Sequence, residues 1–411
     1  MITQMQGQQH PVESQLRIPQ TVWALGFVSL FMDISSEIIH SLLPVFLVSV
    51  LGASVGMVGL IEGVAEGTVM VTRIFSGSLS DWLGRRKILA LAGYGLGALS
   101  KPLFALAPGV GVVFIARFVD RIGKGVRGAP RDALVADVTL PAQRGAAYGL
   151  RQSLDSVGAF VGPLLAIGLM LLTGDQFRTV FWIAFIPGAL AVFMLFKLVK
   201  EPKREKDRNF VSPFNRTSIA MLGRRYWLVV LVGVLFTLAR FSEAFLLLRA
   251  EDIGLQVALI PLILVVMNFS YSVTAFPVGK LSDRIGRRGL MTSGLLVLVA
   301  SDLLLGMAGT LWQVFVGAGL WGLHLGLTQG LLSAWIADAA NPQLRGTAFG
   351  VFGLFSGIAI LLASVLAGWL WQQYSPSITF FSGAFIAAFS LLGFIIIGKN
   401  SPVDNSKTAV R

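Results

Sequence analysis

Three titratable side chains interrupt the apolar stretch at 31–46, "FMDISSEIIHSLLPVF". An α-helix turns about 100° per residue, so Asp33, Glu37 and His40 share one helical face. The surrounding apolar run carries no lysine or arginine that could neutralise the two carboxylates. Because an unpaired carboxylate within a membrane is functional by default, we expect these three side chains to bind protons or a substrate.

This set of side chains suits a cation. Carboxylate and imidazole ligands without a thiolate favour Ni²⁺, Co²⁺ or Mn²⁺ over Cu(I), and the chain has no cysteine. Asp33, Glu37 and His40 are therefore candidate metal ligands. A carboxylate in a low-dielectric cavity can also load and release a proton near neutral pH. Cation and proton would then compete for one group, which is the basis of exchange.

Further charges lie in other apolar runs of the first half. One ionised group at the centre of a membrane helix costs about 2.5–3.5 kcal/mol, so these groups must line a polar cavity or pair with one another. The second half offers fewer: Arg240, Glu243, Asp302 and His324. The predicted substrate- and proton-binding residues are Asp33, Glu37, His40, Glu62, Glu66, Arg117 and Asp155.

Structural roles for the same charges are the alternative. Glu62 and Glu66 share a helical face with Arg73, which could satisfy one of them. Arg151 and Asp155, four residues apart, have the spacing of a structural pair. The fourth span carries a stripe of charged residues that could instead brace the loop containing Asp81. The stripe consists of Arg117, Asp120, Arg121 and Lys124.

The elements that position these residues are membrane helices. The chain has 411 residues, of which 55% are hydrophobic and 13% charged, whereas soluble domains carry roughly 25% charged residues. Apolar runs of about 20 residues predict an all-α membrane protein with twelve spans. They lie near 21–50, 55–76, 88–107, 109–127, 145–172, 178–198, 226–249, 256–279, 289–309, 311–334, 346–371 and 378–398.

Basic residues gather in alternate loops, which accounts for the net charge of +12 without a nucleic-acid partner. They follow the even-numbered spans, so the positive-inside rule places both termini in the cytoplasm. Residues 1–20 and 399–411 are the expected tails. The first apolar run has no small-residue cleavage site, so no cleavable signal peptide is expected.

The chain repeats itself at one offset. "GSLSDWLGRRK" begins at Gly77 and "GKLSDRIGRRG" begins at Gly279, 202 residues later. "ADVTLPAQRGAAYG" at Ala136 and "ADAANPQLRGTAFG" at Ala337 are 201 residues apart. These pairs predict two homologous six-helix halves, 21–198 and 226–398, joined by a cytoplasmic linker at 199–225. Two parallel halves with a site between them are typical of transporters.

The repeated loop resembles the signature between the second and third helices of the major facilitator superfamily. The resemblance implies the major facilitator fold and a gate at the cytoplasmic ends of the helices. The glycines would allow close helix approach, and the arginines could bridge the halves. The gate residues carried over are Gly77, Asp81, Gly84, Arg85 and Arg86, with Gly279, Asp283, Gly286, Arg287 and Arg288 in the second copy.

Two further resemblances narrow the branch. Gly158, Gly162 and Pro163 in the fifth span are similar to the motif of the drug/proton antiporters. "MDISSEIIHSLLPVFLVSVLGAS", "LIEGVAE" and "DRIGKGVRGAPRDALVADV" look like a subgroup associated with nickel resistance, whose members are proton-driven efflux proteins of the inner membrane. Some members end in a histidine-rich tail, whereas this chain ends in "GKNSPVDNSKTAVR".

Three functions remain open at this point. The first is proton-coupled export of a divalent metal such as nickel or cobalt, and the second is proton-coupled export of an organic compound or drug. The third is a membrane sensor that transports nothing, against which the doubled gate signature argues. An enzyme is not expected, because no nucleophile–base set, P-loop or dinucleotide fingerprint is present. We expect a monomer in the lipid bilayer, without a cofactor.

Overall fold

The structure is a computed structural model that describes residues 18–202, 219–285, 287–341 and 344–399. Within these ranges, the side chains at 142, 276, 279–280, 282–285, 287–288, 334, 393 and 395–399 are outside the description. Helices account for all regular secondary structure in the described ranges. The predicted all-α membrane fold is therefore confirmed.

Six helical segments form the first half of the chain. The first is divided into α1, α2 and a π-helical turn, η2, whereas the other five are continuous. A short 3₁₀ turn at Pro141–Gln143 precedes α6. The helices are α1 (Gln20–His40), α2 (Leu43–Val45), η2 (Phe46–Val50), α3 (Val55–Leu83), α4 (Arg86–Leu106), α5 (Val110–Asp137), α6 (Arg144–Thr173) and α7 (Phe177–Leu198).

The second half follows the same plan, with its first segment divided into α9 and α10. A 3₁₀ turn, η4 (Val257–Leu259), leads into α11. The helices are α9 (Arg224–Leu238), α10 (Ala244–Asp252), α11 (Leu262–Ile285), α12 (Arg287–Gly306), α13 (Leu311–Ala339), α14 (Arg345–Gln373) and α15 (Pro376–Lys399).

Each of the twelve predicted spans coincides with a helix or a divided helix. Nine of the described segments are long and apolar enough by themselves to cross a membrane. The segment α5 is not among them, since charged residues from Arg117 to Asp137 lower its hydropathy. The helices α3 and α5 extend to Leu83 and Asp137, beyond the predicted ends of their apolar runs.

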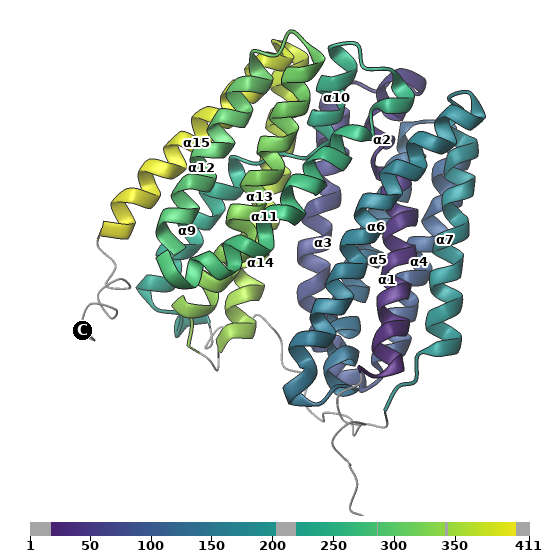
Figure 1. The fold of residues 1–411 in the computed structure, drawn as a ribbon, viewed down its shortest axis with the longest axis vertical. Helices are drawn as coiled ribbons and strands as arrows, with labels where there is room; N and C mark the ends of the chain where they lie inside the picture. The colour runs from purple at the N-terminus through teal and green to yellow at the C-terminus, as the bar shows by residue number, and fades with distance from the viewer. Residues whose placement is uncertain (1–17, 203–218, 286, 342–343, 400–411) are drawn as a thin grey trace, which may run out of the picture.

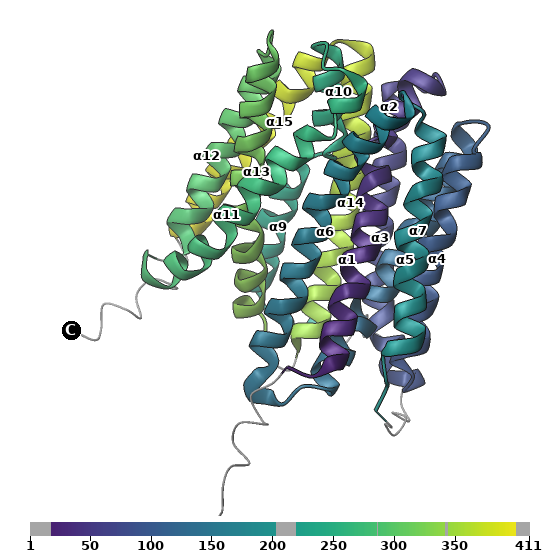
Figure 2. The same cartoon turned by 45° about the vertical axis from the view of Figure 1, so that its right-hand side comes forward.

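The helices α1–α7 and α9–α15 form two groups that meet along two boundaries (Figures 1 and 2). The helix α3 packs against α14 along one boundary, and α6 packs against α11 along the other. A Cβ atom at Gly63 would lie 2.9 Å from the Leu361 carbonyl oxygen, and one at Gly67 would lie 3.1 Å from that of Gly357. Small residues thus let the backbones of α3 and α14 approach closely.

The first segment of each half is broken near one end of the molecule. We call the end with α2 and α10 the upper end, as it stands in Figure 1, and the end where α1 begins the lower end. Pro44 cannot donate to the His40 carbonyl and clashes with it, so α1 ends at His40. In the second half the Ser242 hydroxyl accepts a hydrogen bond from the Ala244 amide (3.2 Å), which separates α10 from α9.

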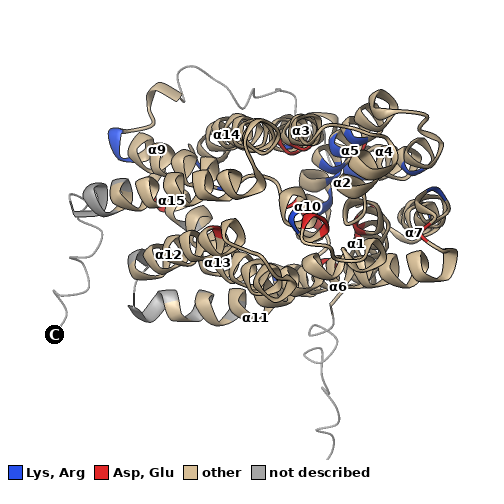
Figure 3. Cartoon of the chain, turned by 90° about the horizontal axis from the view of Figure 1, so that it is seen from above, with Lys and Arg blue, Asp and Glu red and all other residues tan. Residues whose placement is uncertain are grey.

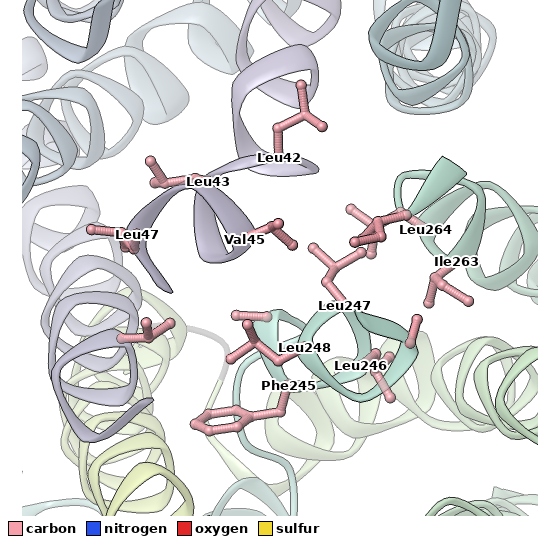
Figure 4. Close-up of a cluster of buried hydrophobic side chains, with 14 of the residues drawn as sticks. Leu42, Leu43, Val45, Leu47, Phe245, Leu246, Leu247, Leu248, Ile263 and Leu264 are labelled. Atoms are coloured by element: carbon pink, nitrogen blue, oxygen red, sulfur yellow. The ribbon is translucent and has the colours of Figure 1, made fainter. Parts of the chain in front are cut away.

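The two breaks bring α2 and α10 together in an apolar cluster (Figure 4), which we call the upper plug. Its side chains are buried, and two of them come from the start of α11. Burying one large apolar side chain contributes about 1.5–3 kcal/mol of hydrophobic free energy. The sum of these contributions holds this end closed. The labelled residues are Leu42, Leu43, Val45, Leu47, Phe245, Leu246, Leu247, Leu248, Ile263 and Leu264.

Candidate functional site

A cavity of about 300 Å³ lies between the two halves, below the upper plug. It is bounded by α1, α3, α5 and α6 of the first half and by α11 of the second. Its lining contains the side chains of three acids, four bases and several neutral hydrogen-bonding groups. They are Asp33, Glu37 and Asp155; Arg73, Lys124, Arg127 and Arg131; and Gln152, Ser156, Asn268, Tyr271 and Ser272.

The lining differs in charge from the carboxylate-rich cavity that the sequence predicts. The face of α5 that carries the bases turns into the cavity, and Figure 3 shows Lys and Arg concentrated on this helix. His40 is not part of the lining. The cavity can therefore offer partners to positive and negative groups of one substrate, rather than to a cation alone.

Asp33 is the acidic group of the cavity without a fixed partner. No hydrogen bond or ion pair joins Asp33 to another described residue, although the charges of Asp155, Lys124, Arg127 and Arg131 act on it from across the cavity. Lys124 is an exposed cation without such a bond among the described residues. Both groups are thus available to a substrate or a proton.

Two glycines of the predicted antiporter motif set the position of α1. A Cβ atom at Gly158 would lie 3.0 Å from the Asp33 Cβ atom, and one at Gly162 would lie 2.6 Å from the Glu37 Cβ atom. The third residue of the motif, Pro163, is buried inside α6. Glycine at 158 and 162 therefore lets α6 approach the backbone that carries both carboxylates.

Glu37, His40 and Glu62 form a chain that leads from the cavity into the protein. The His40 Nδ1 atom is 3.5 Å from Glu37, and its Nε2 atom is 3.8 Å from Glu62. Arg117 then donates to Glu62 at 2.6 Å. Glu62 is fully buried and Arg117 is 2% exposed, so this pair is enclosed, whereas Glu37 borders the cavity.

A second charged chain surrounds Asp120 on α5. Its Oδ1 atom accepts a hydrogen bond from Lys101 at 2.8 Å, and its Oδ2 atom is 3.5 Å from Arg121. Arg121 in turn lies 3.3 Å from Glu66. Lys101 also donates to Ser36 of α1 at 3.1 Å. These contacts tie α1, α3, α4 and α5 into one unit.

Glu62 and Glu66 are thus paired with arginines of α5 and not with Arg73. Arg73 lies 3.8 Å from Asp132 instead. The separation along the helix explains this, because seven residues from Glu66 to Arg73 correspond to about 10 Å of rise. The alternative in which Arg117 and Arg121 brace the loop of Asp81 is not what the structure shows. Their ion-pair partners are Glu62, Glu66 and Asp120, and Asp81 lies 15 or more residues further along α3 than the two glutamates.

Asp155 joins the cavity to the arginines at its lower end. Arg151 donates to Asp155 at 2.5 Å, the pairing that the spacing predicts. The Arg131 guanidinium is 3.8 Å from Asp155 and donates to Ser29 at 3.0 Å. Of the seven predicted binding residues, Asp33, Glu37 and Asp155 reach the cavity, whereas Glu62 and Arg117 lie behind it.

The first copy of the gate signature forms contacts within the first half. Arg86 donates to Asp81 at 3.0 Å and lies 2.6 Å from Asp137, which joins the lower end of α3 to that of α5. These two partners of Arg86 belong to its own half, whereas a bridge between the halves is predicted. The side chains of the second copy at Gly279, Asp283, Gly286, Arg287 and Arg288 lie outside the described residues.

The glycines of this signature do not all serve close packing. Gly84 ends α3 in the left-handed conformation, with φ +60°, which favours glycine. A Cβ atom at Gly77 would make an ordinary contact of 3.6 Å with Ala129, so space does not require glycine there. Arg85 is exposed between α3 and α4.

Two charges of the second half face the same region and were not among the predicted site residues. Glu243, at the break before α10, interacts electrostatically with Glu37, His40 and Glu66 across the boundary. Arg240 interacts with Glu243 and Glu66. The repeat offset of 202 is the signal that could have identified both residues. It makes position 242 the equivalent of His40, and Arg240 and Glu243 flank that position.

The three predicted metal ligands do not form a metal site in this structure. In the described part of the chain, no group of three or more His, Asp and Glu side chains is placed to hold a metal ion. His40 contacts Glu37 and Glu62, whereas Asp33 lies seven residues, or about 10 Å, further along α1. The observed grouping is a chain of titratable side chains beside a mixed-charge cavity.

Two helical groups around a polar cavity, closed at one end, are the structure of a membrane transporter. The family model of the Major Facilitator Superfamily matches residues 25–249 and 229–410. The chain therefore belongs to this superfamily, and its members are transporters rather than enzymes.

Individual relatives agree over nearly the whole chain. An uncharacterised MFS-type transporter of Methanocaldococcus jannaschii is 31% identical over 393 residues, covering 94% of this chain and 96% of the relative. The multidrug resistance protein MdtH of Cronobacter sakazakii is 26% identical, covering 87% and 86%. Among solved structures, a variant of the nucleoside transporter NupG has a TM-score of 0.79 at 12% identity, covering 92% of this chain and 99% of that one, a likeness of fold alone.

Proposed function

We propose that this protein exports a small polar organic compound in exchange for protons by alternating access between the two halves. The observation that carries the proposal is Asp33, a carboxyl group without a fixed partner in a cavity at the boundary between the halves. Intramembrane acids in such positions typically mark proton relays.

The positive-inside rule supports an orientation with the lower end in the cytoplasm. Basic residues lie at that end, among them Arg85, Arg86, Lys87 and Arg144, whereas the upper plug is apolar. The plug closes the cavity above, and the lining at Arg73, Arg131 and Gln152 lies toward the lower end. In this orientation the structure corresponds to a state that loads substrate from the cytoplasm at the inner membrane.

Exchange follows if proton and substrate compete for the same oxygen atoms. A cationic group of the substrate binds the Asp33 carboxylate, while Lys124 or Arg131 binds an acidic group. After the halves move, protonation of Asp33 from the outside removes its charge and releases the substrate. The proton leaves to the cytoplasm when the cavity faces inward again, so one proton enters for each substrate molecule exported.

The lining favours an organic compound over nickel or cobalt. Four basic side chains surround Asp33, Glu37 and Asp155, and a hard or borderline metal ion prefers anionic and imidazole ligands without nearby cations. Asn268, Tyr271 and Ser272 supply amide, phenol and hydroxyl groups from the second half, which are suited to hydrogen-bonding groups of an organic substrate. The relative from C. sakazakii is named as a multidrug resistance protein.

The proposal can be tested with purified protein in liposomes under an imposed pH gradient. Three probes separate the charge classes: a zwitterionic fluoroquinolone, the cation tetraphenylphosphonium, and Ni²⁺ with Co²⁺. We expect gradient-driven transport of the zwitterion that collapses when a protonophore is added. Transport of Ni²⁺ or Co²⁺ alone would instead establish the metal function, and transport unaffected by the protonophore would exclude proton exchange.

A further inference from the structure

Asp302, in the second half, is a buried acid that the cavity does not explain. It lies in α12 and is fully buried, and neither carboxyl oxygen has a hydrogen-bond partner among the described residues. An isolated ionised carboxylate in such surroundings is far too costly in free energy to persist. The group is therefore carried as the neutral acid in this state.

Gly383 and the Phe241 ring lie near Asp302, and Phe241 belongs to an aromatic cluster. A Cβ atom at Gly383 of α15 would lie 2.7 Å from its Oδ2 atom and 3.0 Å from the Phe241 ring. The Phe241 ring lies 5.3 Å from that of Trp321 and 5.5 Å from that of Phe380. Phe241 belongs to the break between α9 and α10, so the part of the second half that lacks regular helix lies close to the acid.

No described charge compensates Asp302. No described hydrogen bond involves its carboxyl group, and the charged or titratable side chains nearby in the second half have other partners. His324 of α13 bonds the Gly294 carbonyl oxygen at 2.8 Å. Arg240 interacts with Glu243 and Glu66. Arg249 of α10 is engaged by Asp252 and by the carbonyl oxygens of Leu305 and Ala308.

The corresponding place in the first half is built differently. Lys101 of α4 precedes Asp302 by 201 residues, the offset that also separates Ala136 from Ala337. Lys101 is neutralised by Asp120 at 2.8 Å. Trp321 occupies the position 201 residues after Asp120, and its indole N–H is also buried without a described partner. The titratable side chain at this place thus has a partner in one half and none among the described residues in the other.

We propose that Asp302 is a second proton-binding site, which holds its proton in the state seen here and releases it when the α9–α10 break moves Phe241 away. On release the carboxyl O–H bond breaks, the proton passes to water admitted by that movement, and the carboxylate remains. The inference rests on the proposed function. It adds a proton tied to the conformational change, whereas Asp33 exchanges its proton with the substrate.

Infrared difference spectroscopy tests the protonation state without any substrate. Parent protein and Asp302→Asn are compared in liposomes, and the carbonyl-stretch band of a protonated carboxylic acid is followed. We expect a band in the parent that Asp302→Asn lacks and that Ser301→Ala retains. Ser301 is a matched control, because it lies next to Asp302 in the chain, is buried and bonds the Gly317 carbonyl oxygen at 2.8 Å. An unchanged band region in Asp302→Asn would overturn the assignment.

Proton release is tested by a pH jump across the liposome membrane. The Asp302 band should weaken when the jump drives the parent into its other state, and a band that stays constant would contradict release. Gradient-driven transport of the fluoroquinolone should fall by about tenfold or more in Asp302→Asn; transport at the parental rate would also contradict it. If the parent transports none of the probes, the proposed function fails, while the band still decides whether Asp302 takes up and releases a proton.

Discussion

Ser49 donates a hydrogen bond to Glu251, and the two residues are 202 positions apart, the offset of the internal repeat. Ser49 lies near the end of the first divided segment and Glu251 near the end of α10, so equivalent positions of the two halves touch at the upper end. This contact joins the two halves at the upper end. The proposed alternating access requires the two residues to separate once in every transport cycle.

A reversible cross-link between these positions should therefore stop transport. The chain has no cysteine, so Ser49→Cys with Glu251→Cys introduces the only two thiols. Oxidation should join them, reduce transport to background and leave it recoverable with a reducing agent. Each single variant serves as the control and should be insensitive to the oxidant. Full transport by the oxidised double variant would show that the upper end stays closed during the cycle.

Asp33→Asn should abolish the response of transport to a pH gradient. Asparagine keeps the shape and hydrogen-bonding capacity of the protonated acid but cannot release a proton. We expect gradient-driven transport of the fluoroquinolone to fall by about tenfold or more and its remaining rate to be flat with pH. Asp175→Asn is the matched control, because Asp175 lies in the turn after α6 at φ +61°, a conformation that asparagine tolerates. A parental pH profile in Asp33→Asn would remove Asp33 from the proton pathway.

Loss of one partner of the buried pair Glu62–Arg117 should destabilise the protein. In Glu62→Gln the Arg117 guanidinium stays buried without its counter-charge, which costs about 3–5 kcal/mol in free energy of unfolding. Glu62→Gln combined with Arg117→Met should recover most of this loss. Thermal unfolding in detergent measures both. An unchanged melting temperature in Glu62→Gln would contradict the assigned contribution of this ion pair to stability.

The sequence predicted the membrane spans well because hydropathy is set by the bilayer and not by the fold. Twelve apolar runs fall on twelve helical segments. The breaks at 41–42 and 239–243 were not predicted, since apolar residues continue on both sides of each break and the apolar run was interpreted as one span, although Arg240 and Glu243 lie in the second break. Pro44 was the residue that could have indicated the break in the first half. The repeat offset would then have predicted an equivalent break in the second half.

The candidate site was predicted less completely, because helical periodicity places residues on a face without saying which helix the face meets. Asp33 and Glu37 were expected to face a cavity, and they line it. The partners of Glu62 and Glu66 were not predicted, since the packing of α3 against α5 is tertiary structure that the residue pattern of a single helix does not specify. The same lack of tertiary information hid the basic lining and the isolation of Asp302.

The close contact of α6 with α1 can be tested at Gly162. In Gly162→Ala the added Cβ atom would lie 2.6 Å from the Glu37 Cβ atom and 3.1 Å from the Ile34 carbonyl oxygen. Both neighbours belong to the core of α1, so α1 must shift, at a cost of about 1–3 kcal/mol in stability. The shift displaces Glu37 from His40, and we expect transport to fall with it.

Gly168→Ala provides the control on the same helix. A Cβ atom at Gly168 meets nothing within 4 Å, and alanine raises helix propensity by about 1 kcal/mol. Gly168→Ala should therefore keep the parental transport rate and melt at or above the parental temperature. If both variants transport equally well, the Gly158 and Gly162 contacts serve packing alone and do not set the position of the α1 carboxylates.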